Sequence, residues 1–124
     1  MKGIGNLPDR VRIYEVGPRD GLQNESKPIS KADKVRFIDL LSAAGLPAIE
    51  ITSFVRPGAI PQLADAGEVA ASISRTAGTL YTALVPNIRG MDRAREVGLN
   101  GIAVFTAASE TFSQRNTNAS IAAT

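Results

Sequence analysis

Strand-like and helix-like segments alternate along the chain, and this order predicts βα units arranged around a parallel sheet. The strand-like segments cover residues 11–16, about 48–52, 80–85 and 102–106. The helix-like segments between them cover about residues 30–45, 61–78 and 86–98. We therefore expect an α/β fold with about four parallel strands and with helices outside them.

The first helix-like segment has the clearest boundaries. Ser30 can cap its start, with Asp33 three residues later, and Gly45 is typical of its end. In the second segment, Pro61 suits a first helical turn, and the apolar residues at 63, 69 and 73 are expected to face inward. Residues 116–124 resemble a cap and the opening of a fourth outer helix.

Composition and charge exclude several classes of function. The net charge of +2, with acids and bases interspersed, gives no basic stripe, so we expect no nucleic-acid partner. No apolar run approaches the roughly 18 residues that cross a bilayer, and the first residues show no signal or transit pattern. We therefore expect no membrane partner and a cytoplasmic location. The absence of cysteine excludes disulfides and thiol chemistry from this sequence.

A loop that combines acids, a base and amides follows the first strand-like segment. Residues 15–25 read Glu-Val-Gly-Pro-Arg-Asp-Gly-Leu-Gln-Asn-Glu. The Gly-Pro pair stops the strand, which places Arg19 and Asp20 at its C-terminal end. In barrel and doubly wound α/β folds, chemistry takes place at that end of the sheet. The pattern therefore indicates a functional site.

The same eleven residues resemble a segment of the hydroxymethylglutaryl-CoA lyases, which are divalent-metal-dependent TIM-barrel enzymes. Three further segments follow in the order that such a lyase shows, at residues 49–55, 85–90 and 105–110. The resemblance extends from about residue 8 to about residue 118. It implies the first half of a TIM (β/α)8 barrel of the HMGL-like, or DRE-TIM metallolyase, superfamily.

The length of the chain limits how much of that barrel it can form. A complete barrel needs about 250 residues, so 124 residues hold at most four of its eight βα units. We expect residues 1–124 to form one partial barrel domain, truncated before the second half. Its two open sheet edges favour homo-oligomers or other association. The family also uses two histidines, an asparagine and a cysteine of the second half, so we expect this chain alone to be inactive.

Two glutamates lie within strand-like segments. Strand alternation turns Glu50 to the barrel interior if Ile49 and Ile51 face the helices, and the same assignment turns Glu15 inward beside it. The residues alone leave two readings open, because buried carboxylates can anchor a loop or take part in catalysis. The resemblance implies a role in activity for Glu50 and a supporting role for Glu15.

Asp20 and Arg19 have different candidate roles. Mg²⁺ and Mn²⁺ favour oxygen ligands, although an Asp-Gly pair is also common turn chemistry. The resemblance favours Asp20 as a ligand in a metal site that this chain leaves incomplete. Arg19 can stabilise negative charge on a thioester oxygen, or form a salt bridge with Glu50 that has no catalytic meaning. The resemblance implies that Arg19 contacts the substrate carbonyl.

Three further polar residues, Gln23, Ser53 and Asn87, lie at or just past strand ends. They can bind substrate there, and capping or turn roles are equally open. Ser109 and Glu110 have the same ambiguity. Some relatives place a lysine directly after the Asn-Glu pair, where this chain has serine, so we assign no contact with a CoA phosphate.

The reaction that the resemblance implies is a metal-dependent, retro-aldol-like (Claisen-type) cleavage of 3-hydroxy-3-methylglutaryl-CoA to acetyl-CoA and acetoacetate. Such lyases serve leucine degradation and ketone-body metabolism, and the expected partner is an acyl-CoA. The alternatives are a lyase for a longer branched 3-hydroxyglutaryl-CoA and a non-catalytic truncated half-barrel. Isopropylmalate and homocitrate synthases and carboxyltransferase domains share the barrel, but residues 17–18 and 22–25 favour the lyase.

Overall fold

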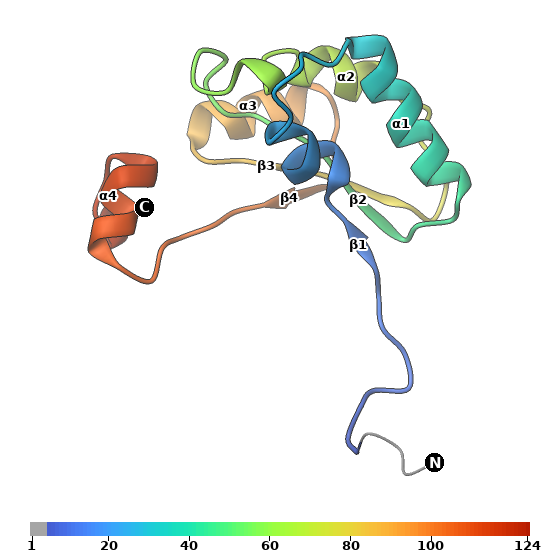
Figure 1. Cartoon of the computed structure of the whole chain (residues 1–124), viewed down its shortest axis with the longest axis horizontal. Helices are drawn as coiled ribbons and strands as arrows, with labels where there is room; N and C mark the ends of the chain where they lie inside the picture. Colours follow the sequence, from blue (N-terminus) through green and yellow to red (C-terminus); the bar gives the residue numbers. More distant parts are fainter. Residues whose placement is uncertain (1–4) are drawn as a thin grey trace.

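The computed structural model describes residues 5–124 and shows a parallel sheet covered on one face by helices (Figure 1). The four strands lie side by side in sequence order as β1 (Tyr14–Glu15), β2 (Ala48–Ser53), β3 (Leu80–Leu84) and β4 (Gly101–Ala103). Every neighbouring pair is parallel, so each connection returns across the sheet. The predicted α/β fold of four parallel strands with outer helices is therefore confirmed.

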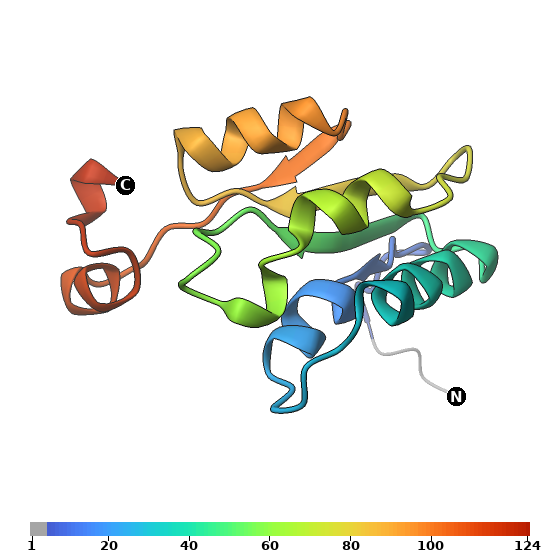
Figure 2. The same cartoon turned by 90° about the horizontal axis from the view of Figure 1, so that it is seen from above.

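Three helices form the covering layer, and Figure 2 shows them together on one side of the strands. They are α1 (Lys31–Ala43), α2 (Ala66–Ser72) and α3 (Ile88–Glu96). Single turns occur at η1 (Gly17–Gly21), η2 (Pro61–Leu63) and η3 (Ile121–Ala123). In the part of the chain that the structure describes, none of the helices combines the length and apolar character needed to span a lipid bilayer.

The helix boundaries follow local sequence signals. Ser30 Oγ accepts a hydrogen bond from Asp33 N at 3.1 Å, and so it caps α1 as the spacing predicts. Gly45 and Gly98 follow α1 and α3 with φ of +82° and +65°, in the left-handed region that glycine adopts without strain.

The hydrophobic core lies between the sheet and the three helices. All six residues of β2 are buried, because helices cover one face and neighbouring strands pair with both edges. Leu63, Val69 and Ile73, which the sequence places inward, are buried in this core. Each buried side chain of this type contributes about 1.5–3 kcal/mol to folding.

Both edge strands are shorter than the sequence predicts. β1 has two residues where the pattern covers 11–16, and β4 has three, starting before the predicted segment at 102–106. Val11 and Val104, which flank the ordered strands, are 79% and 73% exposed. An edge strand has a neighbour on one side only, so fewer hydrogen bonds and contacts extend it.

Helix α4 (Glu110–Thr117) lies apart from the three-helix layer and was not predicted (Figure 1). Asn118 ends it in a left-handed conformation with φ of 54°. Ser120 then accepts a hydrogen bond from Ala123 N and opens the turn η3. The cap and opening turn predicted within residues 116–124 are therefore present, and the helix before them is the missed element.

The register of the sheet corrects the predicted orientation of Glu15. Tyr14 pairs with Ala48, and Glu15 pairs with Ile49. Paired residues on neighbouring strands point to the same face. Glu15 therefore lies on the helix side with Ile49, and the prediction that it faces the interior beside Glu50 is wrong. The cause is register, because a shift of one residue reverses the face of every side chain.

A β-bulge in β2 lies between Glu50 and Thr52. Before it Glu50 pairs with Thr82, and after it Ser53 pairs with Leu84. Thr82 and Leu84 are two residues apart on β3, so they share the face opposite the helices. Glu50 and Ser53 therefore share this interior face although three residues separate them. The predicted interior position of Glu50 is confirmed, while Thr52 leaves the face that simple alternation gives it.

The first turn of α3 should tolerate no side chain at Gly90. A Cβ there would lie 2.7 Å from the Phe54 carbonyl oxygen and 3.3 Å from Pro86 Cδ. We expect Gly90→Ala to lower the free energy of unfolding in urea by about 1–3 kcal/mol. Gly67→Ala in α2 is the matched control, since its Cβ meets nothing within 4 Å and alanine favours a helix by up to about 1 kcal/mol. An equal change in the free energy of unfolding for the two variants would contradict the close approach of Gly90 to the Phe54 carbonyl.

Candidate functional site

Arg19 lies in η1, the turn that directly follows β1. Glu15 holds the start of this turn, because its Oε1 accepts a hydrogen bond from Gly17 N at 2.7 Å. A Cβ at position 17 would lie 2.8 Å from the same oxygen, so a larger residue there would displace the Glu15 carboxylate. Arg19 N and Asp20 N both donate to Val16 O, at 3.1 and 2.7 Å, and close the turn.

The Arg19 guanidinium is anchored by Glu50 of the central strand β2. Arg19 Nε donates to Glu50 Oε1 at 2.5 Å, and the two side chains are 19% and 5% exposed. A buried carboxylate is costly without a cationic or hydrogen-bonding partner, so this pair fixes the position of both groups. The salt bridge that was one reading of Arg19 is thus present. Within the described residues Arg19 Nη2 makes no hydrogen bond, which leaves its donors for another group.

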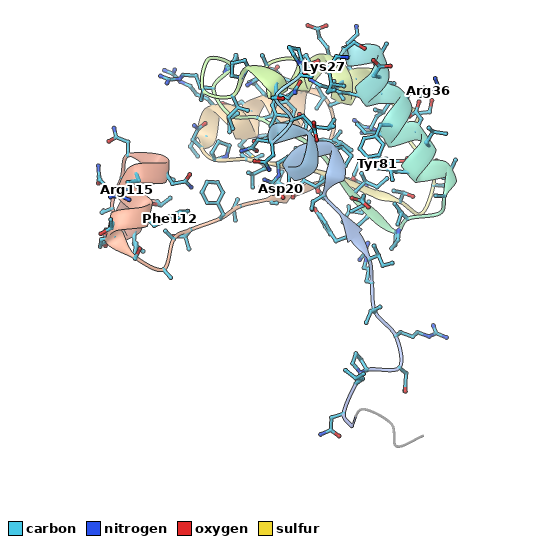
Figure 3. All side chains as sticks on the ribbon, in the orientation of Figure 1. Asp20, Lys27, Arg36, Tyr81, Phe112 and Arg115 are labelled. Atoms are coloured by element: carbon cyan, nitrogen blue, oxygen red, sulfur yellow. The ribbon has the colours of Figure 1, made fainter. Side chains whose placement is uncertain are left out.

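Asp20 lies in the same turn (Figure 3), and its side chain is 57% exposed. Its Oδ1 accepts a hydrogen bond from Arg19 Nη1 at 3.1 Å. Among residues 5–124 there is no group of three or more His, Cys, Asp or Glu side chains placed to hold a metal. Mg²⁺ accepts one or two carboxylates and keeps several waters. Asp20 therefore fits a single ligand position, and the described residues do not form a complete metal site.

A groove of about 1210 Å³ lies at the C-terminal ends of the strands, between the sheet and the segment that carries α4. It brings together four residues that the sequence singles out, namely Arg19, Gln23, Ser53 and Asn87. Its apolar lining includes Val55, Ile60, Met91, Val104, Phe105 and Phe112. Asp20 and Glu50 are not part of this lining, and the ion pair with Arg19 links Glu50 to it.

Two of the groove's polar residues already form internal hydrogen bonds. Ser53 is fully buried, and its Oγ donates to Leu84 O at 3.3 Å. Asn87 Oδ1 accepts from Gly90 N at 2.9 Å and caps α3, so the capping role left open by the sequence is present. Its side-chain NH2 group still has two donors.

Ser109 and Glu110, whose roles the sequence leaves open, act within the α4 segment. Ser109 Oγ caps α4 by accepting from Phe112 N at 3.2 Å. Glu110 Oε2 accepts from Ile121 N at 3.1 Å. Neither side chain lines the groove.

Arg93 supports the groove wall without lining it, and the sequence pattern did not identify it. Its guanidinium lies 5.1 Å from the centre of the Phe54 ring, and its Nη1 donates to Val55 O at 3.1 Å. These contacts fix the loop that follows β2. No sequence signal identifies Arg93, because it resembles the other charged residues of an amphipathic helix.

Loss of the Arg19 side chain should destabilise the fold by isolating Glu50. We expect Arg19→Met to lower the free energy of unfolding by about 3 kcal/mol. Glu50→Gln in the same chain should recover more than half of this loss, since it removes the unpaired charge. The control is Lys31→Met, which breaks an exposed pair with Glu68 and should cost at most about 1 kcal/mol. Additive effects of the Arg19 and Glu50 substitutions would show that the two residues are not coupled.

The fold of this chain is similar to parts of solved lyase structures. Hydroxymethylglutaryl-CoA lyase from Pseudomonas aeruginosa superposes with a TM-score of 0.90 at 57% identity, over 95% of this chain and 39% of that chain. An HMG-CoA lyase from Acinetobacter baumannii, in complex with coenzyme A and 3-methylmalate, superposes with a TM-score of 0.88 at 38% identity. It is covered over 37% of its length, and this chain over 90%.

Curated relatives give the same result. The chain is 58% identical to the 3-hydroxy-3-isohexenylglutaryl-CoA/hydroxy-methylglutaryl-CoA lyase of Pseudomonas aeruginosa, over 94% of this chain and 39% of that protein. It is 48% identical to the mitochondrial hydroxymethylglutaryl-CoA lyase of Rattus norvegicus, over 95% of this chain and 36% of that protein. The chain thus spans little more than a third of these relatives. The HMGL-like family model matches residues 10–124, and the chain belongs to the HMGL-like family.

Proposed function

We propose that the chain supplies the first half of the barrel and part of the active site of a lyase that cleaves 3-hydroxy-3-methylglutaryl-CoA. The observation that carries the proposal is the anchored Arg19 guanidinium, which lines a groove together with Gln23, Ser53 and Asn87. The identity of 58% and 48% to two lyases supports the same chemistry. Residues 1–124 are then one partial barrel domain.

The proposed reaction gives Arg19 a defined task. The substrate hydroxyl loses its proton to a base, the bond between C2 and C3 breaks, and the electron pair moves onto the thioester as an enolate. Protonation of that enolate gives acetyl-CoA, and the other product is acetoacetate. The Nη2 group of Arg19 can stabilise the enolate oxygen, and Glu50 holds the guanidinium in place for it. Gln23, Ser53 and Asn87 bind substrate in this scheme.

Asp20 is the proposed metal ligand of this chain. A bound Mg²⁺ or Mn²⁺ would supply Lewis-acid chemistry that lowers the pKa of the substrate hydroxyl. The exposed Asp20 carboxylate would hold the ion beside Arg19, and the second half of the barrel would provide the other ligands. Glu15 supports the site by fixing Gly17 at the start of the turn.

A longer branched 3-hydroxyglutaryl-CoA is the second candidate substrate. The Pseudomonas aeruginosa relative carries a name that includes 3-hydroxy-3-isohexenylglutaryl-CoA, and it is 58% identical to this chain. The groove has an apolar wall that can accept a branched acyl group or the pantetheine arm of an acyl-CoA. The proposed location of the enzyme is the cytoplasm.

The chain alone should show no lyase activity. We expect the purified protein, with Mg²⁺ or Mn²⁺ and 3-hydroxy-3-methylglutaryl-CoA, to form acetyl-CoA at the rate of the protein-free control. The reason is that the sequence contains no histidine or cysteine, and the described residues contain no group of three or more side chains placed to hold a metal. Metal-dependent cleavage by the monomeric chain would contradict the proposal.

Addition of the missing half should restore cleavage. The test mixes this chain with the part of the Pseudomonas aeruginosa relative that follows its matched segment. We expect the two pieces to associate and to form acetyl-CoA in a metal-dependent way, and Arg19→Lys to lower kcat by about 100-fold. The alternative of a non-catalytic half-barrel predicts association, or self-association through the open edges in analytical ultracentrifugation, without any cleavage.

A further inference from the structure

Gln62 connects two segments that form walls of the groove, although it does not line the groove itself. Its side chain forms three hydrogen bonds with the segment that leads from the Arg19 turn to α1. Nε2 donates to the carbonyl oxygens of Glu25 at 3.3 Å and Lys27 at 3.0 Å, and Oε1 accepts from Ile29 N at 2.9 Å. One amide side chain thus pairs with three backbone groups of an irregular segment.

The path of residues 24–29 depends on these three bonds. The segment's other hydrogen bonds stay close in sequence, such as Asn24 N to Gly21 O at 3.2 Å and Asn24 Nδ2 to Asp20 O at 2.8 Å. Within the described chain, Gln62 provides its only hydrogen bonds to a distant element. Beyond the helical turn that includes Leu22 and Gln23, no strand or helix ladder holds residues 24–29, so loss of Gln62 frees them from the rest of the fold.

A buried lysine fixes Gln62 from the other side. Lys34 of α1 is 5% exposed, and its Nζ donates to Gln62 O and, at 2.7 Å, to Asp65 Oδ1. A buried ammonium group is costly unless it is paired and hydrogen-bonded, so Lys34 holds these two groups firmly. The backbone of Gln62 is therefore tied to α1, while its side chain holds the preceding segment.

We propose that Gln62, fixed by Lys34, is a positioning residue that aligns the two walls of the groove. Gln23 lines the groove directly before the segment that Gln62 holds, and Arg56 and Ile60 line it from the loop that leads into η2, the turn that contains Gln62. We call Gln62, with its three side-chain hydrogen bonds and its contact with Lys34, the Gln62 clamp. The clamp sets the distance between these walls before an acyl-CoA binds. Its catalytic meaning rests on the proposed function, because the groove must be the substrate site.

The first test measures hydrogen exchange of backbone amides and of the Arg19 Nε–H by NMR on the 124-residue chain. We expect Gln62→Met to accelerate exchange about tenfold at Ile29 N and at the Arg19 Nε–H that binds Glu50. The matched control is Arg75→Ala, which removes two hydrogen bonds of 2.6 Å to Val97 O and Gly98 O, away from the groove. The control should leave both signals within about twofold of wild type. Equal responses of the two variants would overturn the clamp.

The second test measures kinetics in the reassembled barrel described above. We expect Gln62→Met to lower kcat/KM about tenfold, through misplaced side chains, and Arg75→Ala to lower it by less than about twofold. Gln62→Glu is the second variant, since it keeps an acceptor for Ile29 N and removes both donors. It should accelerate exchange at Leu22 and Asn24 more than at Ile29, and it decides the matter if Gln62→Met does not fold.

The possible results separate this inference from the proposed function. If Gln62→Met accelerates exchange but leaves kcat/KM of an active barrel unchanged, Gln62 has a merely structural role. That result would overturn the proposal that Gln62 positions the groove walls for catalysis. An inactive wild-type barrel would instead count against the proposed function. In that case the exchange measurement alone decides whether Gln62 aligns the two segments.

Discussion

The ion pair between Arg19 and Glu50 is the interaction on which the arrangement of the groove depends. Glu50 lies in β2, an inner strand of the sheet that is buried throughout, and its side chain is 5% exposed. A carboxylate in that environment requires a partner, and the turn after β1 supplies the guanidinium. The buried carboxylate therefore fixes the position of the turn and the direction of the Arg19 side chain. A preorganised cation at a groove mouth is the arrangement that stabilises developing negative charge.

Local signals made much of this fold predictable. Ser30 with Asp33 defined the start of α1, and Gly45 defined its end, because caps depend on residues close in sequence. Strand ends followed by polar residues identified Arg19, Gln23, Ser53 and Asn87, which line the groove, since the C-terminal ends of parallel strands meet at one edge. Alternation around Glu50 gave its interior position because both flanking residues are isoleucines that suit a core.

Features set by distant contacts were not predictable. The register between β1 and β2 reversed the orientation of Glu15, and the bulge after Glu50 brought Ser53 to the groove face. Neither register nor bulge has a signature within a single strand. Lys34 looks like a solvated helix residue in sequence, yet it is buried because Asp65 and the Gln62 carbonyl come from a separate element. The sequence pattern lacks the information about such partners.

The structural and the catalytic readings of Arg19 are compatible because a guanidinium has more donors than the ion pairs use. Nε donates to Glu50 and Nη1 donates to Asp20, so Nη2 can donate to a substrate oxygen while both ion pairs remain. A lysine would need both acceptors within reach of one ammonium nitrogen, whereas the guanidinium presents separate nitrogens at fixed positions to the carboxylate and to the groove. In the proposed reaction the same separation would let Glu50 contribute although it does not line the groove. Its charge holds and orients the arginine, and the arginine reaches the groove.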